Sequence, residues 1–175
     1  MPYEGNSVNK KPYKNSINGG VVVFKKIIIA LIILFLILFL YLLYPKSITF
    51  EHTYNGIIYS TDNNFEKKTK IILEGTIYRY ILQKDEFIGK IVVDDDISQN
   101  IKMKEHSNKF VGLFSTTDKE GYTRTLGSIQ TSSDLSLIWL NLEEIDERYK
   151  STCYVSGPAN NKAEGNKIAE NILKR

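Results

Sequence analysis

The sequence predicts a mainly β fold of the α+β class, in which one N-terminal transmembrane helix precedes an antiparallel β-sheet domain with a C-terminal amphipathic helix. Three observations support this prediction. Residues 27–44 contain no charge, amide, glycine or proline. Beyond Pro45, short stretches alternate apolar with polar residues and are separated by turn residues, as half-buried strands are. The last residues change to helical spacing.

The apolar run divides the chain into three parts. At about 1.5 Å of rise per residue it would form a helix of roughly 27 Å, close to the hydrocarbon thickness of a bilayer. The segment before it is polar and interrupted by glycine and proline. We therefore expect a disordered cytoplasmic tail at 1–20, a transmembrane helix at 21–44 and an extracytoplasmic β-rich domain at 45–175.

The distribution of charge sets the expected topology. The formal net charge is only +3, but five lysines precede the apolar run against the single acid Glu4. Because positive residues collect on the cytoplasmic side, we expect a single-pass protein of the cell membrane with its N-terminus inside and its domain outside. A cleaved signal peptide is the competing interpretation. The run is longer than an ordinary signal core, however, and no pair of small residues follows it.

Composition also bears on partners. The domain after the apolar run is nearly neutral and lacks the basic surface charge of a nucleic-acid-binding protein. The expected partners are the lipid bilayer and an envelope protein or glycan, with no nucleic acid and no cofactor. Cys153 is the only cysteine, which excludes an intrachain disulfide, and we expect it to be a small core residue. An external domain without disulfides is more typical of a bacterial surface than of a eukaryotic secretory protein.

The first half of the domain is expected to form two hairpins. Two strand-like stretches, 48–53 and 57–59, flank Asn55-Gly56, the pair most typical of a tight hairpin turn. The stretches 67–82 and 87–93 then alternate as an antiparallel pair, and 94–108 is predicted to be a loop with at most a short strand. The shared inward face of that pair is expected to contain Thr69, Ile71, Leu73, Gly75, Ile77, Phe87, Gly89, Ile91 and Val93.

The second half supplies further strands. We expect strands at 109–116 and 122–130, joined by a hairpin connection at 117–121, and a last strand at 151–156. Residues 135–142 are apolar on both faces for most of their length, which predicts a central strand with Trp139 as a core anchor. The charged stretch 143–150 is expected to be a helical turn or a long loop.

A helix is expected at 161–174. Asn161 and Glu164 have the spacing of a capping box, in which each side chain satisfies a free backbone amide at the helix start. The apolar stripe that should pack on the sheet contains Ile168, Ala169, Ile172 and Leu173. Gly165 is expected to weaken this helix by about 1 kcal/mol relative to alanine.

The most suggestive polar cluster is Asp94-Asp95-Asp96, because hard cations bind several carboxylates together. The alternate acids and following glycine of a calcium loop are missing, so a solvated loop is the expected role, and cation binding there stays an open alternative. The acidic run 143–147 is interpreted in the same way.

Other residue types give no catalytic pattern. His52 and His106 are far apart and lack zinc-ligand spacing. Ser132-Ser133-Asp134 lacks a nucleophile elbow and is predicted to be a turn. We therefore predict no catalytic, cofactor-binding or metal-binding residues, and a protein that is not an enzyme.

Aromatic residues are frequent outside the apolar run. An exposed aromatic row on a sheet could bind glycans or peptides, although filling the core and pairing across strands is the more common role. Tyr78 and Tyr80 fall on the face opposite Ile71 and Leu73, so they are the first pair to test for exposure. The aromatic residues beyond the run include Tyr54, Tyr59, Tyr122, Trp139, Tyr149 and Tyr154.

Two stretches carry a family resemblance. Residues 75–95, with Gly75, Phe87 and Gly89, and residues 156–174, with Pro158, Ala159 and Ala169, resemble a group of small, uncharacterised single-pass membrane proteins of Gram-positive bacteria with a β-rich outer domain. The resemblance covers about two thirds of the chain and implies a short tail, one span and an outer β domain. It implies no activity and no catalytic residues.

Three functional hypotheses follow. The first is a membrane-anchored extracytoplasmic domain that binds, or acts as an accessory to, another envelope component. The second is an envelope hydrolase or metal-dependent enzyme that uses the region of Asp94–Asp96 or a histidine. The third is self-association through the span, which however lacks a small-residue seam. An enzyme should gather titratable groups in a pocket, whereas a binding module should expose an aromatic patch or a sheet edge.

Overall fold

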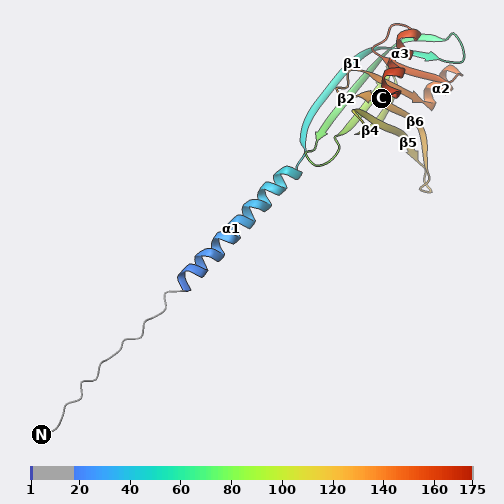
Figure 1. Cartoon of the computed structure of the whole chain (residues 1–175). Helices are drawn as coiled ribbons and strands as arrows, with labels where there is room; N and C mark the ends of the chain where they lie inside the picture. Colours follow the sequence, from blue (N-terminus) through green and yellow to red (C-terminus); the bar gives the residue numbers. More distant parts are fainter. Residues whose placement is uncertain (2–17, 175) are drawn as a thin grey trace. The chain divides into compact units, whose positions relative to one another are not determined.

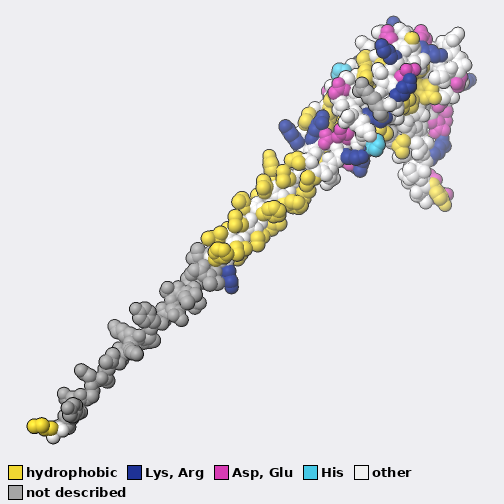
Figure 2. Space-filling view, in the orientation of Figure 1, with side chains coloured by type: hydrophobic (Ala, Val, Ile, Leu, Met, Phe, Trp, Pro, Cys, Tyr) yellow, Lys and Arg dark blue, Asp and Glu magenta, His cyan; other side chains and the backbone are white. Residues whose placement is uncertain are grey.

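The N-terminal part of the structure is a long apolar helix. The computed structural model describes Met1 and residues 18–174, so the predicted tail lies mostly outside the described residues. Helix α1 (Asn18–Leu43) starts three residues before the predicted boundary at 21. From Phe24 to Leu43 it is long and apolar enough to cross a membrane (Figure 2). The chain divides into two compact units, Met1–Tyr41 and Leu42–Arg175.

The second unit is a closed barrel of eight antiparallel strands (Figure 1). Each strand pairs with the next one along the chain, and the last pairs with the first. The mainly β prediction is confirmed, while closure into a barrel was not predicted, because period-two alternation is the same in an open sheet and a closed one. The strands are β1 (Lys46–Ser60), β2 (Glu66–Arg79), β3 (Glu86–Val93), β4 (Ile97–Glu105), β5 (Lys109–Thr117), β6 (Thr123–Ser132), β7 (Ile138–Leu142) and β8 (Cys153–Gly157).

The barrel interior is a packed hydrophobic core. Eight strands enclose a space that side chains can fill, and here Ile71, Leu73 and Phe87 are among the fully buried residues. Helix α2 (Glu143–Tyr149) contributes Ile145 to the same core. The predicted inward face of β2 and β3 is confirmed by this burial and by a register that places Gly75 opposite Gly89.

A second hydrophobic cluster lies outside the barrel, under helix α3 (Lys162–Leu173). The predicted capping is confirmed, since Asn161 Oδ1 accepts a hydrogen bond from the Glu164 amide at 2.9 Å. Gly165 is buried against Tyr59, where a Cβ atom would lie 2.8 Å from Cε1 of the ring. The glycine that weakens the helix locally therefore lets it approach the barrel closely. The cluster contains Ile57, Tyr59, Trp139, Ala159, Ile168 and Ile172.

Three predictions about single elements were wrong. Asn55-Gly56 does not turn, because β1 runs without interruption through both residues. A Cβ atom at Gly56 would lie 2.6 Å from Ile71 Cδ1 and 2.8 Å from the Ser156 carbonyl oxygen, so the glycine permits close packing. The prediction that Trp139 anchors a core is confirmed, since it is buried in the hydrophobic cluster under α3.

The predicted loop at 94–108 is mostly strand β4. Its alternate residues Ile97, Ile101 and Met103 are buried in the core, and the polar Gln99 between them disguised the pattern. The predicted central strand at 135–142 is shorter, since β7 begins at Ile138. Leu135 reaches the core from a turn, with a φ of 59°.

Candidate functional site

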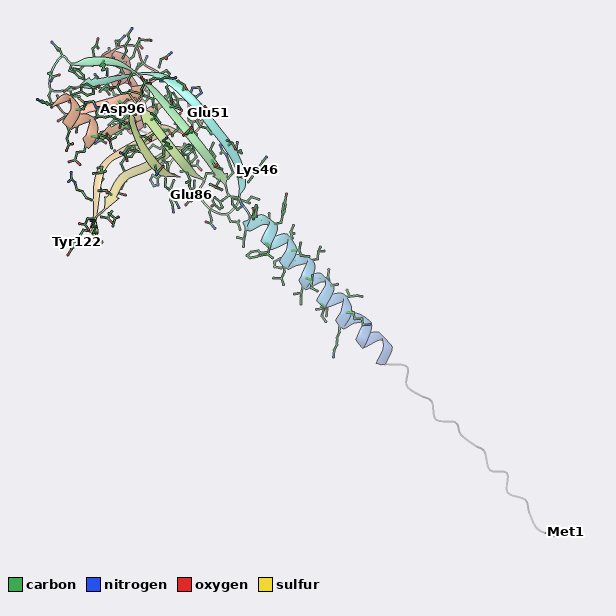
Figure 3. The ribbon with its side chains drawn as sticks, turned by 180° about the vertical axis from the view of Figure 1, so that it is seen from behind. Met1, Lys46, Glu51, Glu86, Asp96 and Tyr122 are labelled. Atoms are coloured by element: carbon green, nitrogen blue, oxygen red, sulfur yellow. The ribbon has the colours of Figure 1, made fainter. Side chains whose placement is uncertain are left out.

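β1 is paired on both sides for only part of its length. It pairs with β2 from Lys46, opposite Arg79, to Tyr59, opposite Glu66. Its pairing with β8 is confined to residues 57–60. β8 ends at Gly157, and Pro158 after it has no amide hydrogen to donate to a ladder. The N-terminal part of β1 therefore forms an open edge at the border of the barrel (Figure 3).

The direction of the backbone groups on this edge follows from two hydrogen bonds. The Ser60 amide donates to the Phe65 carbonyl at 3.1 Å, which turns the even-numbered residues toward β2. The Asn55 carbonyl accepts from the Ala159 amide at 2.9 Å, which turns the odd-numbered residues away from β2. No described residue bonds to the outward backbone groups of the four odd-numbered residues Ser47, Thr49, Glu51 and Thr53.

The outer face beside this edge is acidic. Glu51 lies directly opposite Glu74 on β2, and like charges in that position repel each other. Lys90 on β3 lies opposite Glu74 on its other side, so it can offset the charge of Glu74. On its open side, no strand among residues 18–174 pairs with Glu51. A shallow hollow of about 510 Å³ covers this region, lined by Thr49, Phe50, Glu51, Glu74, Gly75, Thr76, Gly89, Lys90 and Asn100.

The inner face of the same edge is apolar and aromatic. Ile48 is 41% exposed, although it lies on the face that points into the barrel. Phe50 is half-buried, with its ring centroid 6.2 Å from that of Phe87 in an edge-on arrangement. His52 is exposed, and its ring centroid lies 4.5 Å from that of Tyr54. An added strand would thus meet apolar groups on one face and carboxylates on the other.

In the predicted acidic cluster, Asp94 and Asp96 both form ion pairs with basic side chains. Asp94 and Asp95 have φ values of 56° and 69° and form the turn between β3 and β4. Asp94 accepts hydrogen bonds at 2.6 Å from Lys67 Nζ and from the Tyr149 hydroxyl. Asp96 accepts two from Arg148, at 2.7 and 3.0 Å.

These contacts explain the pKa values of Asp94 and Asp96. Partial burial raises the pKa of Asp94, but the hydrogen bonds from Lys67 and Tyr149 outweigh it and hold the pKa below its usual value. The Arg148 guanidinium lowers the pKa of Asp96. Both carboxylates thus already have cationic partners, and the contacts tie α2 to the β3–β4 turn.

The other predicted polar residues do not form a metal site. In the part of the chain that the structure describes, no three His, Cys, Asp or Glu side chains are grouped so that they could hold an ion. His52 is on β1, and His106 lies in the β4–β5 connection with Nδ1 3.2 Å from Lys84 Nζ. Ser133 and Asp134 lie in a turn, as predicted, while Ser132 is the last residue of β6. Hydrogen bonds from the Ser132 hydroxyl and from the Ser136 amide and hydroxyl lower the pKa of Asp134 to about 2.

Most of the aromatic side chains outside the apolar helix pack against other residues. Tyr78 and Tyr80 are half-buried and do not form an open row. Trp139 and Tyr154 stack with ring centroids 5.6 Å apart beside α3. Tyr122 is 72% exposed at the tip of the β5–β6 hairpin (Figure 3). Cys153 is fully buried, as expected, and burial raises the pKa of its thiol.

Comparisons of the chain with protein-family models, with curated protein sequences and with solved structures found no match. The candidate site is therefore identified from the geometry of the structure alone. Sequence reasoning missed the open edge, because the Asn55-Gly56 interpretation divided β1 into two short strands. One signal was available, since Gly157-Pro158 limits the length of the last strand.

Proposed function

We propose that this protein is a membrane-anchored, extracytoplasmic binding protein of the bacterial cell envelope, with its N-terminus in the cytoplasm. It binds an extended segment of another envelope protein, which adds as a strand to the open edge of β1. The observation that supports this proposal is the row of backbone groups at Ser47, Thr49, Glu51 and Thr53 that no described residue occupies.

Strand addition suits this edge for physical reasons. Each backbone hydrogen bond formed in the complex contributes about 0.5–1.5 kcal/mol net, so several together support specific but reversible binding. Alternate side chains of the ligand supply selectivity. A residue opposite Glu51 would meet the repelling Glu51/Glu74 pair, so lysine or arginine is favoured there. Residues on the other face would cover Ile48 and Phe50, so apolar side chains are favoured there.

The alternative of an envelope hydrolase or metal-dependent enzyme lacks a supporting arrangement among the described residues. Asp94 and Asp96 are engaged by Lys67 and Arg148. The Ser132 hydroxyl donates to Asp134 at 2.5 Å within a turn. These contacts favour the binding proposal over an active site at either place.

The test combines site-specific photocrosslinking with a backbone substitution. A photoreactive amino acid replaces Thr53 in the full-length chain in intact cells, and the crosslinked partner is identified. Thr49→Pro removes one edge amide without removing a β1–β2 hydrogen bond, and Thr49→Val keeps that amide. We expect Thr49→Pro to reduce the yield of the crosslinked adduct at least tenfold, which corresponds to a loss of about 1.4 kcal/mol or more of binding free energy. Thr49→Val should leave the yield nearly unchanged. Equal adduct yields in the two variants would contradict strand addition.

The charge of Glu51 gives a second measurement that does not require the natural partner. Random peptides are selected for binding to the full-length chain in phospholipid nanodiscs. The enriched sequences should alternate apolar and polar residues, with lysine or arginine among the polar ones. Glu51→Lys should shift the selected polar residues toward aspartate and glutamate, because the edge then carries a positive charge. Selection of the same peptides by both chains would argue against the assigned face.

A further inference from the structure

The loop between β2 and β3, residues 80–85, presents two large apolar side chains to solvent. Ile81 is 65% exposed and Leu82 is 62% exposed, and they are adjacent in the sequence. Both lie outside the two hydrophobic clusters. Exposed apolar side chains that are grouped at a loop tip are typical of a contact surface.

The base of this loop is fixed by Asp85. Its carboxylate accepts hydrogen bonds at 2.9 Å from the Tyr80 amide and from Arg79 Nη1. Its carbonyl oxygen accepts from the Glu105 amide at 2.8 Å. Asp85 is itself only 7% exposed. The loop is thus held at its base, while Ile81 and Leu82 at its tip are exposed.

The loop lies at the end of the barrel where the chain arrives from α1. Arg79, the last residue of β2, is the register partner of Lys46, the first residue of β1. Leu43 ends α1, and three peptide bonds connect it to Lys46, a Cα separation of at most about 11 Å. Leu43 also belongs to the same compact unit as the barrel. Figure 3 labels Lys46 on β1 and Glu86 at the start of β3, which follows the loop.

The charges around the loop suit a phospholipid surface. Lys84 follows Leu82 by two positions, Lys46 is the register partner of Arg79 at the base of the loop, and both lysines are exposed. Two of the acids at the base of the loop are neutralised, because Asp85 pairs with Arg79, and Glu86 pairs with Lys102 at 3.1 Å and Lys104 at 3.2 Å. Apolar side chains flanked by lysines bind at the boundary between headgroups and acyl chains.

We infer that the β2–β3 loop inserts Ile81 and Leu82 into the interface of the same bilayer that holds α1, with Lys46 and Lys84 on the headgroup phosphates. The occupant of this surface is lipid, because the short connection from Leu43 keeps the loop within reach of the membrane. The inference rests on the membrane anchoring in the proposed function but does not depend on strand capture. Its consequence is that the barrel is held at two points, which restricts rotation about the two-residue connection, Tyr44-Pro45.

The test measures the depth of nitroxide spin labels in the full-length chain. The chain is reconstituted in vesicles of phosphatidylcholine containing phosphatidylglycerol. Single labels are placed at Leu82→Cys, at Tyr122→Cys and at Phe35→Cys, and the unsubstituted chain shows whether buried Cys153 reacts. The depth of each label is obtained by comparing how strongly two paramagnetic reagents relax it. Oxygen concentrates in lipid, whereas a water-soluble nickel chelate stays in the aqueous phase.

We expect the label at position 82 to be relaxed several-fold more by oxygen than by the chelate. The label at 122, where the native side chain is also well exposed, should show the reverse. The label at 35 reports the anchor. If it lies in lipid while the labels at 82 and 122 behave alike, the loop inference is wrong and anchoring stands. If the label at 35 is accessible to the chelate, both the anchoring and the loop contact are wrong.

Discussion

The two halves of β1 pair with the same neighbour and have opposite environments. Residues 46–53 are exposed apart from half-buried Phe50, whereas residues 54–60 are buried apart from exposed Asn55. Both halves pair with β2 in one continuous register. Only the second half also pairs with β8 and lies under α3. The difference therefore comes from the second neighbour and not from β1 itself.

The two halves of β1 contribute differently to the stability of the fold. The closed half, residues 54–60, contributes Tyr54 and Ile58 to the barrel core and Ile57 and Tyr59 to the cluster under α3. The open half, residues 46–53, keeps its outward backbone groups available. Because it contributes little to the core, its surface can be adapted to a partner at small cost to folding.

The largest expected difference between the two halves is in the loss of stability when one isoleucine in each is replaced by alanine. Ile58 is fully buried and Ile48 is 41% exposed. We expect Ile58→Ala to lower the free energy of unfolding by about 2–5 kcal/mol, and Ile48→Ala to lower it by less than about 1 kcal/mol. Denaturant titration of the full-length chain in detergent micelles measures both. Similar losses would show that the two halves do not differ in stability.

A smaller effect should come from the helix that covers the closed half. Gly165→Ala adds a Cβ atom 2.8 Å from Tyr59 Cε1 and 3.0 Å from Ile57 Cγ2. Alanine gains about 1 kcal/mol of helix propensity, but overpacking costs about 1–3 kcal/mol, so we expect a net loss of about 1 kcal/mol. Lys167→Ala, at an exposed position of the same helix, is the matched control and should change stability little. A stabilising Gly165→Ala would mean that α3 does not pack closely on β1.

The smallest expected effect is a pH dependence of stability that comes from the turn around Asp134, which contacts Tyr54 in the closed half. The Tyr54 hydroxyl donates to the Leu135 carbonyl in the turn that Asp134 organises. The pKa of Asp134 is lowered from 3.8 to about 2. Its stabilising contribution is thus complete above pH 4 and is lost as the pH falls toward 2. Asp134→Asn should be less stable than the parent at neutral pH, and the difference should shrink between pH 4 and 2 in urea titrations. A difference that does not change with pH would contradict this role.

Several parts of the fold could be predicted because they depend on local properties of the chain. The inward face of β2 and β3 follows from alternation, as the burial of Ile71, Leu73 and Phe87 confirms. The start of α3 follows from the spacing of Asn161 and Glu164. β4 was missed because its alternation is interrupted by Gln99, and no local feature shows that a polar residue can lie on an inward face.

The candidate site could not be predicted in the same way. Asn55-Gly56 has the local preference of a turn, but Ile71 and Ser156 pack against Gly56 from strands far away in the sequence. Trp139 is apolar enough for a core position, yet the sequence does not show which of two hydrophobic clusters it joins.

The apolar helix, the alternation of β2 and β3 and the capping of α3 follow from the sequence alone, because hydropathy, alternation and capping are properties of neighbouring residues. The closure of eight strands into a barrel, and the pairing of a fifteen-residue β1 with a five-residue β8, depend instead on contacts between distant segments. A strand has the same local pattern with one neighbour as with two. The open edge is therefore a consequence of pairing between distant segments, and only their arrangement in space reveals it.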